Sequence, residues 1–138
     1  MIEVAAAIIE NDQGQILIAR RKKGKSQEGM WEFPGGKLEP GESPETCLIR
    51  ELQEEMGIEI IPYEWFGNNE HDYGTVQIKL IAYMAKYSQG EIKLTDHDEY
   101  RWAGRSELSE YDWAPADIPF VERLLSLRHP IPRESLGS

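Results

Sequence analysis

The chain has 138 residues, of which 40% are hydrophobic, and this suits a single domain with an ordinary core. Its formal net charge of −10 argues against DNA, RNA or an anionic membrane as the main partner, because these bind clustered lysine and arginine. Neither a leader peptide nor an apolar run of about 18 residues is visible, so we expect a cytoplasmic protein, with both a monomer and a homodimer left open. We expect the domain to span residues 1–129, followed by a disordered tail over 130–138 that holds two prolines.

The first part of the chain predicts a hairpin followed by a glycine loop. Residues 2–9 and 16–21 are rich in aliphatic side chains and flank a turn-like Asn-Asp-Gln-Gly segment, so they are expected to be paired strands. A short extended segment around residues 31–33 then leads into Gly35 and Gly36. Such a glycine pair either adopts a positive φ or lets the backbone approach a ligand closely.

A helix is expected between Ser43 and Gly57. Ser43 followed by Pro44 is typical of a helix N-terminus, and Gly57 is typical of a helix end. The apolar positions of this helix recur every four residues and predict a face that packs on the core: Leu48, Leu52 and Met56. The single cysteine, Cys47, has no cysteine partner in the chain and is expected to be a small buried packing residue.

The neighbouring face of the same helix is acidic. Glu51, Glu54 and Glu55 fall at i, i+3 and i+4, so their carboxylates meet. Like charges at this spacing cost a few tenths of a kcal/mol per pair, and Arg50 offsets only part of that repulsion. The face is either a solvated helix surface or a site for a hard divalent cation, which prefers oxygen ligands.

The second half of the chain predicts three further strands and a second helix. The strands are expected at residues 60–67, 75–87 and 99–103, where apolar side chains alternate or β-forming residues gather. Pro119 is expected to open the helix, whose apolar side comprises Phe120, Val121, Leu124, Leu125 and Leu127. Strands interrupted by one helix and completed by another imply an α/β fold, an α/β/α sandwich with a mixed β-sheet.

Residues 36–58 read GKLEPGESPETCLIRELQEEMGI. This run resembles the signature of the Nudix hydrolases: a glycine, five residues, a glutamate, seven residues, Arg-Glu, an aliphatic residue, any residue, Glu-Glu, any residue, a glycine and an aliphatic residue. Every fixed position is filled, by Gly36, Glu42, Arg50, Glu51, Leu52, Glu54, Glu55, Gly57 and Ile58. The resemblance implies a Nudix-type sandwich and a metal-dependent hydrolase of nucleoside diphosphates linked to another group.

The resemblance also assigns roles to the acidic face. It implies that Mg²⁺, or in its place Mn²⁺, is held by Glu51, Glu54, Glu55 and the backbone carbonyl of Gly35. Arg50 is expected to orient a glutamate through a charge-assisted hydrogen bond. Catalysis is expected to involve Glu51, Glu54 and Arg50, and the resemblance leaves open which glutamate activates water, because family members differ.

Two further contacts are expected near this face. Relatives of the MutT type place another acidic metal ligand before a late tryptophan, and Asp96 matches that position ahead of Trp102, with Glu99 as a rival. An acid in such a loop is also often merely solvated. The basic segment 20–25 is either a solvated hairpin rim or a phosphate contact, for which Arg21 is the best candidate.

Beyond the signature, four segments resemble MutT-type triphosphate pyrophosphohydrolases: VAAAIIE, LIARR, WEFPGGKLEPGES and APADIPFVERL. The last segment particularly resembles bacterial CTP pyrophosphohydrolases. The resemblance implies that the loop residues Glu32, Phe33, Gly36 and Lys37 contact the substrate.

Two positions are expected to contact the base. Asp117 stands where an asparagine reads the oxidised purine in the relatives that remove 8-oxo-dGTP. A carboxylate accepts hydrogen bonds only, which suits the amino group of cytosine, although guanine also offers donors. Tyr73 aligns with an aromatic residue that flanks the base. The alternatives are a helix N-cap for Asp117 and ordinary strand packing for Tyr73.

Three functional hypotheses follow. The first is conversion of CTP or dCTP, with or without a modified base, to the monophosphate and pyrophosphate. The second is removal of 8-oxo-dGTP or another oxidised nucleotide. The third, from a different class, is a catalytically silent nucleotide-sensing module of Nudix fold, although such a module has no need of the complete acidic set.

Overall fold

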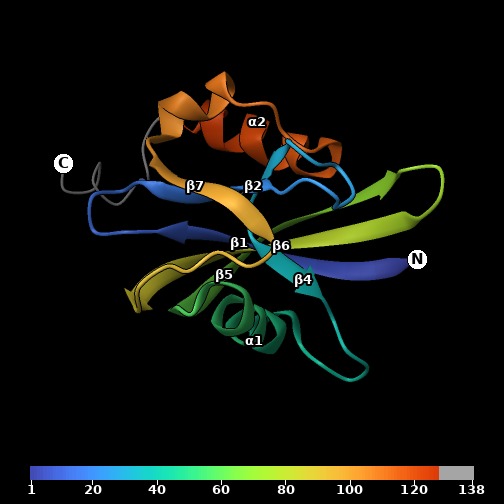
Figure 1. Ribbon diagram of the computed structural model, residues 1–138, viewed down its shortest axis with the longest axis horizontal. Coiled ribbons are helices and arrows are strands. Elements are labelled where there is room, and N and C mark those ends of the chain that lie inside the picture. Colours follow the sequence, from blue (N-terminus) through green and yellow to red (C-terminus); the bar gives the residue numbers. More distant parts are fainter. Residues whose placement is uncertain (128–138) are drawn as a thin grey trace.

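The computed structural model describes residues 1–127, which form three layers with one mixed sheet between two helices (Figure 1). The elements in chain order are β1 (Ile2–Glu10), β2 (Ile16–Arg21), β3 (Trp31–Glu32), β4 (Gly35–Lys37), α1 (Pro44–Met56), β5 (Glu59–Asp72), β6 (Gln77–Gln89), β7 (His97–Ala103), the 3-10 turns η1 (Arg105–Glu110) and η2 (Pro115–Asp117), and α2 (Ile118–Ser126). The expected domain end at residue 129 and the expected tail over 130–138 lie outside the described residues.

The sheet is mixed because β1 pairs in both senses. It runs parallel to β6, with Ile2 opposite Ile78, and antiparallel to β2 and β4. The strand order is β3-β2-β1-β6-β5, with β4 paired to β1 and β7 paired to β2. The expected hairpin of residues 2–9 and 16–21 and the expected mixed sheet are therefore both confirmed.

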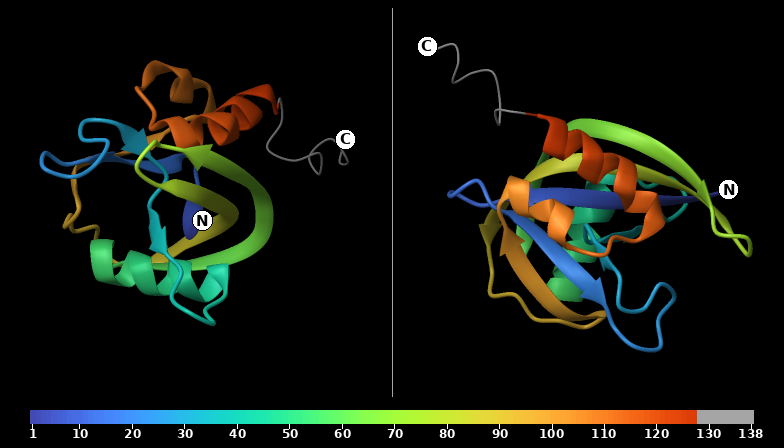
Figure 2. Two further views of the ribbon diagram at one scale, coloured as in Figure 1. Left: turned by 90° about the vertical axis from the view of Figure 1, so that its right-hand side faces the viewer. Right: turned by 90° about the horizontal axis from the view of Figure 1, so that it is seen from above.

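Both faces of the sheet are covered. Alternate buried residues of β1 face opposite sides: Ala6 and Ile8 belong to the cluster under α2, whereas Ala7 and Ile9 belong to the cluster over α1. Figure 2 shows α2 and the 3-10 turns over one face and α1 over the other. The helices contribute Phe120, Val121 and Leu124 to the first cluster and Leu48, Leu52 and Met56 to the second. The α/β/α sandwich expected from the sequence is the observed architecture.

The late strands are longer than the sequence pattern predicts. The strand expected at 60–67 extends over 59–72, and the other two expected strands extend to 77–89 and 97–103. β5 lies at the end of the strand order and shifts register on either side of Pro62 and before Gly67. Bulges on an edge strand accommodate a proline and a glycine that would otherwise end it, so the pairing with β6 continues past both residues.

The expected ends of α1 are confirmed. The side chain of Ser43 accepts a hydrogen bond from the backbone N–H of Thr46 at 3.1 Å, which satisfies one free donor of the first turn. Gly57 ends the helix with a φ of 68° and donates its N–H to the carbonyl of Gln53 at 3.0 Å. No helix within residues 1–127 is long and apolar enough to cross a membrane.

Fewer apolar residues of the second helix are buried than expected. α2 begins at Ile118 with Pro119 in its first turn, as predicted, and ends at Ser126. Leu125 and Leu127 were expected on the buried side, but they are 38% and 40% exposed. Leu125 follows the buried Leu124 directly, so the 3.6-residue repeat turns it away from the sheet.

Candidate active site

The acidic side chains of α1 are organised around Arg50. Its guanidinium donates to both carboxylate oxygens of Glu42 at 2.8 Å, to Oε2 of Glu51 at 3.0 Å and to Oε1 of Glu54 at 3.3 Å. The hydrogen bond from Arg50, followed by that from the backbone N–H of Glu39, lowers the pKa of Glu42 to about 2. Glu42 therefore holds Arg50 in place, a role that the sequence analysis did not assign to this signature residue.

Glu55 lies among other acids. Its side chain is partly buried, and burial, followed by the hydrogen bond to Glu51 and the charges of Glu51, Asp96 and Glu32, raises its pKa to about 9. Glu55 therefore experiences the charges of carboxyl groups from three parts of the chain. A cation bound beside Glu55 would relieve their mutual repulsion.

The glycine pair is explained by close packing. A Cβ at Gly35 would overlap the backbone oxygen of Ala5, and a Cβ at Gly36 would overlap the carboxyl group of Glu51. Neither glycine adopts a positive φ. A positive φ is therefore excluded for both glycines. Their lack of a side chain lets β4 pack closely against β1 and the acidic face of α1, and close approach to a ligand stays a prediction.

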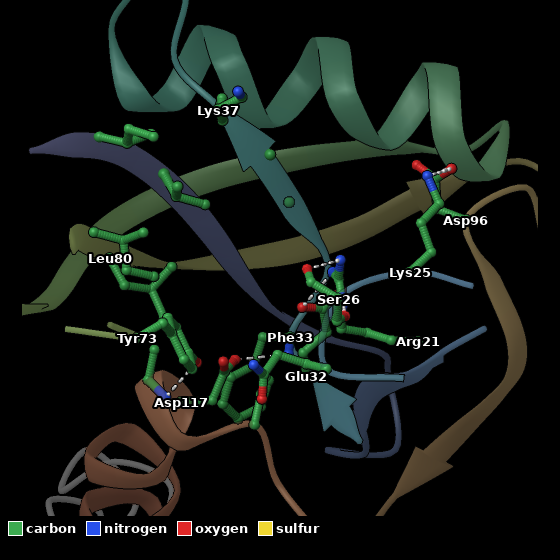
Figure 3. A pocket seen from close by; sticks show the side chains of 18 of the residues that line it. Arg21, Lys25, Ser26, Glu32, Phe33, Lys37, Tyr73, Leu80, Asp96 and Asp117 are labelled. Carbon is green, nitrogen blue, oxygen red and sulfur yellow. Dashed lines mark hydrogen bonds and ion pairs between the residues drawn. The ribbon is translucent and has the colours of Figure 1, made fainter. Parts of the chain in front are cut away.

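A cavity of about 480 Å³ runs from this acidic face to the loop before α2 (Figure 3). Its size is typical of a small-molecule site. Figure 3 shows Lys37 close to α1 and Asp117, together with Tyr73, at the opposite end. Most of the expected site residues line it: Arg21, Glu32, Phe33, Gly35, Gly36, Lys37, Glu55, Tyr73, Asp96 and Asp117. Arg50, Glu51 and Glu54 lie on α1 outside the cavity lining.

One wall of the cavity carries a cluster of three charged or polar side chains. Nη1 of Arg21 lies 3.1 and 3.0 Å from the two carboxylate oxygens of Glu32, and Nε2 of His97 lies 2.8 Å from Oε2 of the same group. Arg21 was expected to contact phosphate, whereas in the structure its guanidinium pairs with Glu32. His97 was not anticipated, because the strand was expected to begin at residue 99, and its place next to Asp96 was the one signal in the sequence.

Asp117 closes the end of the cavity far from α1. It is only 4% exposed, and its Oδ2 accepts the backbone N–H of Phe33 at 3.0 Å. Burial, followed by the charge of Glu32, raises the pKa of Asp117 well above its usual range. Asp117 occupies the N-cap position of α2, but its side chain makes no cap hydrogen bond. The side chain therefore forms part of the cavity wall and does not cap the helix.

The loop that carries Asp117 is held by two polar side chains. The hydroxyl oxygen of Tyr73 accepts the backbone N–H of Ala116 at 3.0 Å, and Nδ2 of Asn69 donates to the carbonyl of Ala116 at 2.9 Å. Tyr73 follows the end of β5 and lines the cavity. Asn69 was not predicted as a functional residue, because the strand was expected to end at residue 67.

The structure separates the two candidates for the late acidic ligand. Asp96 lines the cavity beside Glu55 and lies 3.3 Å from Nζ of Lys25. Glu99 instead pairs with Arg20 at 3.3 Å and with Arg101. Only Asp96 of the two lies where it would share a cation with Glu55.

The donor chemistry of the acidic face fits a hard divalent cation. Glu51, Glu55 and Asp96 offer oxygen atoms alone, and these are the ligands that Mg²⁺ and Mn²⁺ prefer. Within residues 1–127 no three His, Cys, Asp or Glu side chains stand ready in a metal-ligand arrangement. The reason is visible: Glu51 is turned toward Arg50, and the side chain of Glu54 is 60% exposed.

Cys47 is a packing residue, as expected. It is fully buried, and its Sγ lies 3.5 Å from the carbonyl oxygens of Gly36 and Lys37. Burial, followed by the charge of Glu42, raises the pKa of the Cys47 thiol to about 12. A thiol with such a pKa is a poor nucleophile at neutral pH.

Comparisons with known proteins identify the family. The NUDIX domain matches residues 2–124 of the chain. A CTP pyrophosphohydrolase of Escherichia coli is 42% identical over 93% of this chain and 94% of the relative. An 8-oxo-dGTP diphosphatase of Haemophilus influenzae is 36% identical over 94% and 95%, and one of Escherichia coli is 32% identical over 91% and 98%.

Solved structures show the same fold. The solution structure of the Escherichia coli ORF135 protein superposes with a TM-score of 0.82 at 41% identity, covering 96% of this chain and 94% of that one. The crystal structure of a MutT protein from Methanosarcina mazei gives a TM-score of 0.81 at 28% identity, covering 89% and 91%.

Fold, signature acids and comparisons define an enzyme class, the hydrolases of phosphoric anhydrides in small nucleotides. The chain belongs to the Nudix family. It is a Nudix pyrophosphohydrolase, whose family generally uses divalent metal ions, and the names of its relatives leave its substrate unresolved. Membership of an enzyme family with every signature acid in place sets aside the hypothesis of a catalytically silent module.

Proposed function

We propose that the protein converts CTP or dCTP, with or without a modified base, to the monophosphate and pyrophosphate with Mg²⁺ or Mn²⁺ as cofactor. The observation that carries this proposal is the single cavity that joins the acidic face of α1 at one end to the buried Asp117 at the other. A nucleoside triphosphate matches this arrangement, because its phosphates lie at one end of the molecule and its base at the other. The CTP pyrophosphohydrolase among the relatives supports the choice of base.

The polyphosphate belongs at the α1 end. Glu51, Glu54, Glu55, Asp96 and the carbonyl of Gly35 would hold the cation there. When bound, Mg²⁺ supplies positive charge that neutralises the phosphate oxygens and stabilises the leaving pyrophosphate.

The chain's own side chains complete this end of the site. Lys37 lines the same end of the cavity and offers an ammonium group to the phosphates. Gly36 keeps the wall free of side-chain atoms beside Glu51.

The side chains of α1 handle the water and its proton. Arg50, fixed by Glu42, holds Glu51 and Glu54 by charge-assisted hydrogen bonds. One of these carboxylates accepts a proton from water, whose oxygen then bonds to a phosphorus of the α,β-anhydride. The bridging P–O bond breaks, and the products are the nucleoside monophosphate and pyrophosphate.

The base belongs at the Asp117 end. Oδ2 of Asp117 is engaged with the N–H of Phe33, which leaves Oδ1 for the edge of the base. Because burial raises the pKa of Asp117, this carboxyl group can donate as well as accept a hydrogen bond, and the edge of cytosine offers both an acceptor and a donor. Tyr73, an aromatic residue that lines this end of the cavity, is proposed to stack on the base.

Removal of 8-oxo-dGTP is the second candidate. It is favoured by the 8-oxo-dGTP diphosphatases among the relatives, at 36% and 32% identity. Guanine also presents a ring N–H and an amino group as donors, and these suit an accepting carboxylate such as that of Glu32. Asp117 separates the two candidates, because a carboxyl group stands where the relatives of this type are expected to carry an asparagine.

The test is a substrate panel at fixed Mg²⁺. We would measure kcat/KM for CTP, dCTP, a base-modified dCTP, UTP, dGTP and 8-oxo-dGTP, and identify the products. We expect monophosphate plus pyrophosphate, with a cytidine nucleotide preferred at least about tenfold, which corresponds to one specific hydrogen bond. A decisive preference for 8-oxo-dGTP would replace the first candidate with the second, and release of orthophosphate alone would contradict both.

A further inference from the structure

The Glu32 carboxylate is fixed by donors from two strands. Its Oε2 accepts from Nη1 of Arg21 on β2 at 3.0 Å and from Nε2 of His97 on β7 at 2.8 Å, whereas Oε1 accepts only from Nη1 of Arg21 at 3.1 Å. A carboxylate oxygen has about two lone-pair positions. Oε2 is therefore filled, and Oε1 is the atom that still accepts a hydrogen bond from the cavity.

His97 is the buried partner in this arrangement. Its side chain is 2% exposed, compared with 25% for that of Arg21. Because a carboxylate only accepts, the bond to Glu32 places a proton on Nε2. Nδ1 has no hydrogen-bond partner among residues 1–127. Among residues 1–127, the buried imidazole of His97 therefore has one polar contact, its hydrogen bond to Glu32.

Glu32 and Asp117 form a pair of unlike hydrogen-bonding groups in one wall. They flank Phe33, whose N–H binds Asp117, and Figure 3 shows the three residues together. The raised pKa of Asp117 favours its protonated form, which donates, whereas Glu32 is held as an acceptor by Arg21 and His97. Cytosine presents an amino donor beside a ring-nitrogen acceptor, and uracil presents an oxygen acceptor beside a ring N–H.

We infer that His97 is a positioning residue for base selectivity, which holds Glu32 so that Oε1 accepts the amino group of cytosine. This inference rests on the proposed function and adds to it a residue outside the Nudix signature that acts through Glu32. Removal of His97 frees a lone pair of Oε2 and leaves the carboxylate to Arg21, whose side chain lies at the rim and also bonds Ser26. The carboxylate then has more than one orientation, and discrimination between cytosine and uracil declines.

The test compares three substitutions of one residue: His97→Gln, His97→Asn and His97→Leu. Binding of CMP and of UMP to the metal-free full-length protein is measured by calorimetry, with thermal unfolding as a check on folding. We expect the wild type to prefer CMP, and His97→Asn and His97→Leu to lower the CMP/UMP affinity ratio about tenfold. His97→Gln should keep the ratio within about threefold, because its amide nitrogen reaches the position of Nε2. Arg101→Gln on the same strand, whose side chain pairs with Glu99, is the control and should leave the ratio unchanged.

The outcomes are distinct. A folded His97→Asn protein with the wild-type ratio overturns the inference, and so does a wild type that does not prefer CMP. If His97→Leu fails to fold, the contrast between Gln and Asn decides. Pyrophosphate release from CTP by the wild type tests the proposed function separately. If the wild type prefers CMP but does not hydrolyse CTP, the proposed function alone is wrong. If the wild type hydrolyses CTP but His97→Asn keeps the wild-type CMP/UMP ratio, the role of His97 alone is wrong.

Discussion

Glu54 contributes little to the fold although it belongs to the signature. Its side chain is 60% exposed and pairs with Arg50 at 3.3 Å, and exposed pairs of this kind contribute about 0–1 kcal/mol. We therefore expect Glu54→Gln to change the free energy of unfolding by less than about 0.5 kcal/mol. We expect the same variant to lower kcat at least about 100-fold, as for loss of a general base or metal ligand. Steady-state kinetics and urea denaturation measure the two quantities.

The matched control for this change is Glu122→Gln, on the exposed face of α2. It removes the same charge from the other helix and should leave kcat unchanged. Near-normal turnover by Glu54→Gln would show that Glu54 is not central to catalysis and that another carboxylate accepts the proton from water.

The two adjacent glycines should respond differently to alanine. At Gly35 the new methyl group meets the backbone of Ala5, which is held in the central strand, so we expect a loss of about 1–3 kcal/mol or more of stability. At Gly36 it meets the carboxyl end of Glu51, which can rotate away, so we expect a smaller stability loss with a large fall in kcat. Thermal unfolding and kinetics of both variants check this, and equal stability losses would contradict it.

Cys47 should resist alkylation in the folded protein. A thiol whose pKa is raised to about 12 stays protonated throughout the range from pH 7 to 9, and the thiolate is the reactive form. We expect iodoacetamide to label the folded protein at pH 8 at least about 100 times more slowly than the protein in concentrated urea. Mass spectrometry follows the labelling, and rapid stoichiometric modification of the folded protein would show that the thiol is accessible.

Among the secondary-structure elements, α1 is capped by residues that stabilise it independently of its acidic side chains. Ser43 caps the first turn through Thr46, and loss of such a cap costs about 0.5–2 kcal/mol. Ser43→Ala should lower the free energy of unfolding by this amount while Ser88→Ala, at an exposed position of β6, should lower it by less than about 0.5 kcal/mol. Chemical denaturation compares the two, and an unchanged midpoint for Ser43→Ala would show that the cap is not used in solution.

The elements also show where sequence patterns were sufficient. The ends of α1 followed from Ser43, Pro44 and Gly57, because capping depends on a few neighbouring residues. The length of β5 did not, because its extension to Asp72 depends on pairing with a strand that begins at Gln77. A long hairpin is stabilised by its partner strand, and local propensity does not report the partner.

For the whole molecule, acid stability should depend on the ion pair between Glu42, in the turn before α1, and Arg50 on α1. Arg50 lowers the pKa of Glu42 to about 2 from an ordinary value of about 4.5. The folded state therefore binds this proton less readily than the unfolded state, and the stabilisation is complete above about pH 4.5 and lost as the pH falls toward 2. We expect wild type to be more stable than Glu42→Gln at pH 7 and the difference to shrink between pH 5 and 3. Urea denaturation across this range measures it, and a difference independent of pH would contradict the assignment.

The site itself was predictable in part. The sequence pointed to Gly36, Glu55 and Asp96, and the structure brings these residues to one cavity from β4, α1 and the loop before β7. It gave no reason to connect Arg21 with Glu32, or Glu32 with His97, because each contact joins side chains of two different strands, and the fold decides how those strands lie together. The expectation that Arg21 faces phosphate came from charge alone, and charge does not specify a partner.

The sequence by itself determined the family, the acidic helix with its ends, and the layered fold, because these depend on spacing within single segments: 3.6-residue and two-residue periodicity and the fixed offsets of the signature. Only the tertiary structure decided that Asp117 is buried against Phe33 and that Glu32 is shared by Arg21 and His97. The physical reason is that burial and hydrogen-bond partnership are properties of the space between segments, and folding creates that space.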